Sequence, residues 1–183
     1  SVWMPCAPRK MTKMKTWKSL LIASLMGLTF TAQAGVLLVG SYTDGTSQGI
    51  YRYSFDTRSG QIDATPRQVV KSVSPSWLVL SADQRLLFAV NETPQGHVSS
   101  FSLGTQGQIK PLNQVASRGD EPTHASLSHD QRYLFIANYA VAPVPGGSLV
   151  VIPVTRDGTL KEAVQQLRHA PSKVNPERQS GAH

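Results

Sequence analysis

The chain has 183 residues, the length of one ordinary domain, and a formal net charge of +7 that suggests a nucleic-acid partner. The charge is concentrated at the start, because residues 1–34 hold five basic residues and no acidic one. The other 149 residues carry 13 Lys and Arg against 11 Asp and Glu. The body of the chain therefore lacks the basic surface that nucleic-acid binding needs, and we expect no such partner.

The leader has the parts of a secretory signal. Lysines precede a short apolar stretch at residues 20–30, and the small residues Ala32 and Ala34 follow it at the spacing that a signal peptidase accepts. A core helix is the alternative, but no amphipathic stripe runs through the stretch. We therefore assign residues 14–34 to a cleavable signal peptide and residues 1–13 to an upstream, non-native extension.

These assignments predict an exported protein, with the bacterial periplasm as its location. The apolar stretch is shorter than the roughly 20 residues that span a bilayer, so we expect no membrane partner after cleavage. The single cysteine, Cys6, lies in the extension. The mature chain is therefore predicted to have no disulfide, although its compartment would permit one.

A repeat of 47 residues runs through the rest of the chain. Residues 75–91 (PSWLVLSADQRLLFAVN) align with residues 122–138 (PTHASLSHDQRYLFIAN) at this constant offset. Gly107 and Gly158 continue the pattern at an offset of 51, and the four additional residues fit an inserted loop at 142–146. A period of this size is typical of repeat architectures, so the fold has to be interpreted unit by unit.

Each unit has the pattern of four short strands, expected in the last unit at residues 124–128, 133–138, 147–154 and 160–167. A Ser-x-Asp-Gln-Arg turn joins the first two, and its Ser and Asp oxygens can accept hydrogen bonds from turn amides. The second strand is apolar on both faces, which requires a further sheet on each side. This pattern predicts an all-β fold, a β-propeller of four-stranded blades.

Several stretches resemble the lactonase family of seven-bladed β-propellers, whose best-known activity is 6-phosphogluconolactonase. No single motif is specific, but their combination in this order is, and it covers essentially all of residues 36–183. The matching stretches are Val39–Thr43, Gly49–Tyr51, Pro75–Leu78, Ala89–Glu92, Pro122–His124, Ala137–Tyr139 and Asn175–Gln179.

The resemblance implies that residues 35–183 are the N-terminal part of a propeller, with about three of seven blades present. We place these blades near residues 36–80, 81–127 and 128–175, followed by the start of a fourth. A chain of this extent is expected to be inactive by itself, because the missing blades would contribute to the site.

The implied activity is that of a carboxylic-ester hydrolase, a lactonase that opens a small-molecule sugar lactone to the aldonic acid. The alternative is a non-catalytic exported propeller that binds a protein or glycan partner, because propellers also serve as scaffolds. Export favours an unphosphorylated aldonolactone, since phosphorylated sugar lactones belong to the cytoplasm. No group of His, Cys or carboxylates has metal-binding spacing, and we expect neither a metal nor another cofactor.

The candidate catalytic residues are His124, Arg178 and His183, and the candidate substrate-binding residues are Glu92 and Tyr139. His124 opens an innermost strand, and the pKa of an imidazole suits a general base. The planar guanidinium of Arg178 can hold a carboxylate, phosphate or carbonyl oxygen. Structural roles remain open for all five, as a histidine of the channel wall, a solvated loop arginine or polar residues that end a strand.

We predict that signal peptidase cleaves between Ala34 and Gly35, because Ala32 and Ala34 provide the small side chains that it accepts. N-terminal sequencing of the exported protein measures this directly. A mature N-terminus more than a few residues away, or an uncleaved leader, contradicts the prediction.

Overall fold

The computed structural model describes residues 34–141, 146–171, 173–175 and 181. Eleven strands and no helix make up this part of the chain, so it holds no helix of the length and hydrophobicity that crossing a bilayer requires. Nearly all of the predicted leader lies outside the described residues, as do Arg178 and His183.

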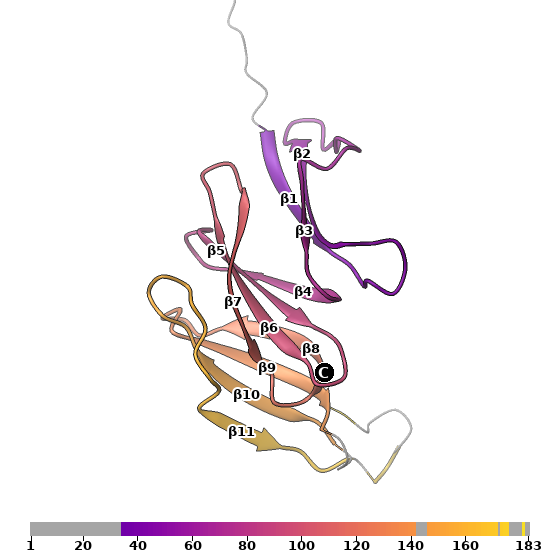
Figure 1. Cartoon of the computed structure of the whole chain (residues 1–183), viewed down its shortest axis with the longest axis vertical. Coiled ribbons are helices and arrows are strands. Elements are labelled where there is room, and N and C mark those ends of the chain that lie inside the picture. Colours follow the sequence, from indigo (N-terminus) through magenta and orange to yellow (C-terminus); the bar gives the residue numbers. More distant parts are fainter. Residues whose placement is uncertain (1–33, 142–145, 172, 176–180, 182–183) are drawn as a thin grey trace, which may run out of the picture. The chain divides into compact units, whose positions relative to one another are not determined.

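The strands form three antiparallel sheets that follow one another along the chain (Figure 1). The first has the order β1-β2-β3 and contains β1 (Ala34–Gly40), β2 (Gly49–Asp56) and β3 (Gln68–Lys71). The second has the order β4-β5-β6-β7 and contains β4 (Pro75–Leu80), β5 (Leu86–Asn91), β6 (His97–Leu103) and β7 (Ile109–Ala116). The third has the order β8-β9-β10-β11 and contains β8 (Asp120–Leu127), β9 (Tyr133–Ala140), β10 (Ser148–Pro153) and β11 (Gln165–Arg168).

Sequential strand order in successive sheets is the arrangement of propeller blades, which confirms the predicted fold class. The 47-residue repeat places β4 and β8 at equivalent positions, as the innermost strands of their sheets. In the first sheet β1 corresponds to the second strand of a blade. Ile50 and His97 are equivalent residues of the repeat, and Gly40 of β1 pairs with Ile50 as Asn91 of β5 pairs with His97. One edge of β1 therefore has no neighbouring strand among the described residues.

The boundaries between the sheets differ from the blade boundaries predicted from the sequence. The expected breaks at residues 80/81 and 127/128 fall within the two hairpins β4-β5 and β8-β9, which are hydrogen-bonded along their length. The sheets instead change at the short linkers 72–74 and 117–119. The predicted units begin at the repeated Ser-x-Asp-Gln-Arg turn, whereas hydrogen bonding keeps both strands of that turn in one sheet.

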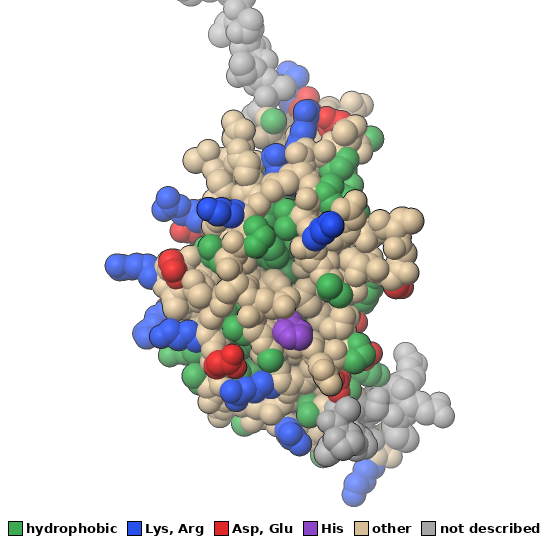
Figure 2. Space-filling view, viewed as in Figure 1, with side chains coloured by type: hydrophobic (Ala, Val, Ile, Leu, Met, Phe, Trp, Pro, Cys, Tyr) green, Lys and Arg blue, Asp and Glu red, His purple; other side chains and the backbone are tan. Residues whose placement is uncertain are grey.

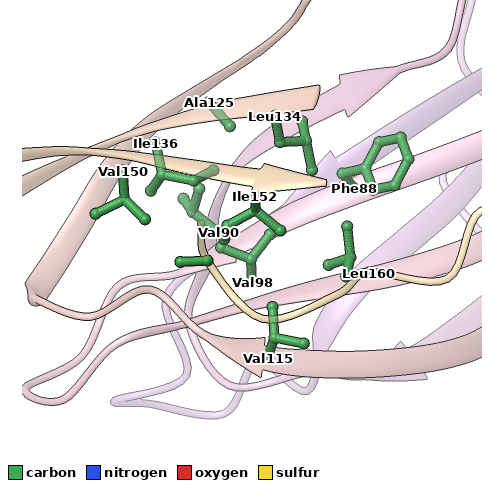
Figure 3. Packing of buried hydrophobic residues seen from close by; sticks show 11 residues of the cluster. Phe88, Val90, Val98, Val115, Ala125, Leu134, Ile136, Val150, Ile152 and Leu160 are labelled. Carbon is green, nitrogen blue, oxygen red and sulfur yellow. The ribbon is translucent and has the colours of Figure 1, made fainter. Parts of the chain in front are cut away.

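The core lies between neighbouring sheets, and β5 contributes to both of its parts. Leu87 and Ala89 pack with residues of the first sheet, including Ile50 and Val70. Phe88 and Val90 point the other way, into a cluster that the second and third sheets share (Figure 3). All five residues of β5 from Leu87 to Asn91 are buried, so the expectation that the second strand is covered on both faces is confirmed there.

Side-chain amides join neighbouring sheets at equivalent points. The amide of Gln68 on β3 bonds both backbone groups of Ile109 on β7, at 2.7 and 2.8 Å. Asn113 on β7 makes the same pair of bonds to Leu160, at 2.8 and 2.9 Å. Ile109 and Leu160 are equivalent residues of the repeat, two positions after Gly107 and Gly158. Each amide satisfies the donor and the acceptor of one backbone residue, which fixes the spacing of the sheets.

The predicted hairpin turns have the expected hydrogen bonds. Ser81 donates to Asp83 at 2.7 Å, and the amide of Arg85 donates to the same carboxylate at 3.0 Å. Ser128 and Asp130 repeat the arrangement in the next sheet, with a hydroxyl-to-carboxylate distance of 2.6 Å. The serine hydroxyls, followed by the backbone amides, lower the pKa of both carboxyl groups because they bond the ionised form.

We predict that Phe88→Ala lowers the free energy of unfolding by about 3–5 kcal/mol, because it leaves a cavity between two sheets. Val164→Ala is the control: this side chain is 65% exposed, and its truncation should change stability by less than about 0.5 kcal/mol. Urea unfolding of the intact protein measures both. Equal effects of the two substitutions contradict the proposed core.

We also predict that replacing both Asp83 and Asp130 by Asn flattens the acid dependence of stability. Their lowered pKa values stabilise the folded state above pH 3.8, the ordinary pKa of the group, and this contribution disappears as the pH falls through the lower folded-state value. The wild type should therefore lose more stability than the double variant between pH 5 and about pH 2. Asp44→Asn, in the exposed loop after β1, is the matched control, and parallel pH profiles for all three proteins contradict the prediction.

Candidate functional site

The candidate site lies where the innermost strands begin. A residue in the left-handed conformation precedes the first proline of each: Ser74, with φ of 40°, and Glu121, with φ of 52°. Such a backbone costs roughly 1–3 kcal/mol for a non-glycine residue and has to be held by its surroundings. The amide of Ser74 donates to the Thr43 hydroxyl at 3.1 Å, and that of Glu121 to the Thr93 carbonyl at 2.9 Å. The start of each inner strand is thus held by the loop of the preceding sheet.

A register shift follows in both strands, between Pro75 and Trp77 in β4 and between Pro122 and His124 in β8. Bulges of this kind change the direction of side chains and are common beside functional sites. Trp77 and His124 are equivalent residues of the repeat, 47 positions apart. The same local geometry therefore presents an indole from one sheet and an imidazole from the next.

The two rings are in contact, with centroids 4.4 Å apart and planes inclined by 47°. The indole N–H of Trp77 donates to the carbonyl of Ala125 on the edge strand β8, at 3.0 Å. Trp77 nevertheless remains 42% exposed, and His124 is half-buried. An imidazole is therefore held against an aromatic wall and is accessible to a small molecule.

A second pair joins the loops after β1 and β5. The hydroxyl of Tyr42 donates to a carboxylate oxygen of Glu92 at 2.8 Å. This hydrogen bond, followed by partial burial and the charge of Glu92, raises the pKa of Tyr42, and the charge of Glu121 acts in the same direction. Tyr42 is 52% exposed. Two carboxylates and a phenol therefore lie near one another at the same end of the sheets as His124.

Buried asparagines hold these loops from behind. The side-chain amide of Asn91, at the end of β5, donates to the carbonyl of Val73 in the linker before β4, at 2.6 Å. Asn138, near the end of β9, donates in the same way to the carbonyl of Ser117 in the linker before β8, at 2.9 Å. A Cβ atom on Gly119 would lie 2.5 Å from Asn138, so the linker passes too close for a side chain. Both asparagines therefore have a structural role, which is to hold the linkers against the ends of the second strands.

The structure describes three of the five predicted site residues. His124 is paired with Trp77 and Glu92 with Tyr42. Tyr139 lies one residue before the end of β9, at the position equivalent to Glu92, and its carbonyl lies against the backbone of Gly181. The two remaining predicted residues, Arg178 and His183, lie outside the described residues.

Sequence reasoning missed Tyr42, Trp77 and Glu121. The signal for Trp77 was present, because the 47-residue offset that defines the repeat places it at the position of His124. Tyr42 belongs to one of the stretches that carry the family resemblance, but its partner is 50 residues away in the sequence. The left-handed backbone of Glu121 had no sequence signal, since glutamate does not favour that conformation.

A cavity of about 900 Å³ lies at the other end of β4 and β5 and is not this site. Its walls are mainly aliphatic, from Val36–Leu38 of β1 together with Leu78, Leu80 and Leu87. The carboxylate of Asp83 at its margin already accepts the hydrogen bonds of its own turn. Gln84, Arg85 and Thr105 add polar groups at the turns, and none of the candidate site residues lines this cavity.

The described residues hold no group of three His, Cys, Asp or Glu side chains that could bind a metal ion. On the face shown in Figure 2, a histidine and hydrophobic side chains are exposed in the middle, whereas Lys and Arg lie mostly toward the margins. The chemistry available from the described part of the site is therefore that of imidazole, carboxylates, a phenol and an exposed indole.

The three sheets are blades of a β-propeller, and the candidate site at the start of their innermost strands carries polar and aromatic side chains. The family model described as "Lactonase, 7-bladed beta-propeller" matches residues 36–183. The chain belongs to this lactonase family of seven-bladed propellers.

Two relatives show how the chain compares with whole members. It is 29% identical over 147 residues to the 6-phosphogluconolactonase of Bacillus subtilis, which covers 79% of this chain and 40% of that protein. It is 43% identical to the structure of a Pseudomonas aeruginosa periplasmic gluconolactonase, with a TM-score of 0.74, over 81% of this chain and 42% of that one. The chain thus spans about two fifths of the length of these relatives.

Proposed function

We propose that this protein is an exported lactonase that hydrolyses a sugar lactone to the aldonic acid. The observation that carries the proposal is His124, an accessible imidazole held by Trp77 at the start of an innermost strand. Membership of the lactonase family and likeness to a gluconolactonase support it.

Lactone hydrolysis needs a water that loses a proton as its oxygen attacks the ring carbonyl. The free nitrogen of a neutral imidazole can take that proton, and its ordinary pKa of about 6.5 suits the task near neutral pH. The ring C–O bond then breaks, and the leaving alkoxide is protonated to give the hydroxyl of the aldonic acid. We assign the first proton transfer to His124.

The carboxylates of the site suit the hydroxyl groups of a sugar. Glu92 accepts a hydrogen bond from Tyr42 and retains lone pairs for a ligand hydroxyl. Tyr139, at the equivalent position of the next sheet, is assigned the same task. We propose that Arg178 and His183 bind the carbonyl oxygen or stabilise its developing charge, a role that requires donors aimed at that oxygen.

We propose an unphosphorylated aldonolactone as substrate and the periplasm as location. The leader at residues 14–34 supports export, and the 43% identical structure is that of a periplasmic gluconolactonase. The nearby carboxylates of Glu92 and Glu121 also disfavour a phosphate group beside them, because like charges repel at short range. We further propose that the chain is part of a longer protein whose other blades complete the site.

A second function is a non-catalytic exported propeller that binds a glycan or protein. The exposed aromatic side chains of Trp77 and Tyr42 favour this alternative, because aromatic residues are enriched where proteins bind partners. Glycan binding without turnover in the assay below would support it.

We predict that His124→Ala in the intact protein lowers kcat for lactone hydrolysis by roughly 10²-fold or more, the loss expected for a general base. The measurement is opening of glucono-1,5-lactone, with the spontaneous rate subtracted. His129→Ala is the matched control, because His129 is exposed in the β8-β9 turn, and it should retain wild-type turnover. Unchanged turnover by a folded His124→Ala protein would assign this histidine a structural role.

A further inference from the structure

We infer that Trp77 is a substrate-specificity residue: its exposed indole is the wall against which the ring of the lactone packs beside His124. The inference rests on the proposed lactonase function and adds to it the residue that recognises the ring form of the substrate.

The indole offers an apolar surface, because its single polar atom is already used. The N–H donates to the carbonyl of Ala125, and this bond fixes the plane of the ring. The side chain is still 42% exposed, although it lies on an innermost strand. A fixed and exposed aromatic surface can bind a ligand without the entropy loss of ordering a mobile side chain.

The wall and the proposed base are adjacent, since the ring centroids of Trp77 and His124 are 4.4 Å apart. A six-membered lactone has two faces of C–H groups and an edge of hydroxyl groups. The C–H faces are attracted to the negative face of an aromatic ring. A lactone that stacks on the indole therefore has its ring, including the carbonyl, near the imidazole.

The polar groups near this end of the sheets suit the hydroxyl edge of the same ligand. Glu92 accepts from Tyr42 at 2.8 Å, and Glu121 lies at the start of β8, the inner strand that carries His124. Carboxylates accept hydrogen bonds from hydroxyl groups. An open-chain aldonate has no flat face of C–H groups and carries a negative charge, so the same surroundings favour the ring lactone over the product.

A structural role for Trp77 predicts a different result. If its only function were to bond Ala125 and support β8, its removal would weaken the binding of every ligand and lower kcat through His124. The two roles are therefore separated by comparing a ring-shaped ligand with an open-chain ligand.

The experiment uses the intact protein, glucono-1,5-lactone as substrate, and D-glucose and gluconate as ring and open-chain competitors. We expect Trp77→Ala to raise KM and the inhibition constant of glucose by about three- to tenfold, the size of an aromatic stacking contribution. We expect the inhibition constant of gluconate to change by less than about twofold, so that the loss of binding is specific to ring-shaped ligands. Trp77→Phe should restore most of the loss, because it keeps an aromatic face.

Leu80→Ala is the matched control, because Leu80 is an exposed apolar residue at the other end of the same strand, and it should leave all these constants unchanged. An unchanged KM in Trp77→Ala overturns the inference, and so does an equal loss for glucose and gluconate. Absence of lactone turnover by the wild type contradicts the proposed function instead. In that case, glucose-dependent quenching of tryptophan fluorescence that Trp77→Phe abolishes still supports a ring-binding wall, and its absence overturns the wall as well.

Discussion

The structure depends on the burial of one strand between two sheets. β5 sends Leu87 and Ala89 toward the first sheet and Phe88 and Val90 toward the third, so a single strand joins two hydrophobic clusters. Fully burying a side chain of this size contributes about 1.5–3 kcal/mol. Because these contacts are made between sheets, the stacking of neighbours determines the position of every loop at their ends.

The loops that form the site are positioned by a second set of interactions. Asn91 ends β5, Asn138 lies near the end of β9, and both bond the linkers that lead into β4 and β8. Ser74 ends the first of these linkers and Glu121 follows the second, and hydrogen bonds to Thr43 and Thr93 hold their left-handed backbone at the start of the innermost strands. The packing of the core thus places the two asparagines, their hydrogen bonds place the linkers, and the linkers place the strands that carry the exposed rings of the candidate site.

The repeat was sufficient to predict the class of fold, because an apolar second strand and a Ser-x-Asp turn have few structural interpretations. It did not predict where one sheet ends, since the repeated turn lies inside a hairpin and the true boundaries are short linkers with little sequence signature. For the site, the innermost strand indicated His124. Tyr42 and Glu92 are 50 positions apart in the sequence and meet only through the packing of two sheets, so no local sequence pattern indicates their hydrogen bond.

The contact between Trp77 and His124 has an evolutionary consequence. Both residues occupy the same position of the repeat, so identical copies of one unit would place two indoles or two imidazoles there. The asymmetric pair arises only after duplicated units have diverged at this position while the surrounding bulge is retained. The scaffold of such a propeller can therefore remain repetitive while equivalent positions of its blades carry different side chains.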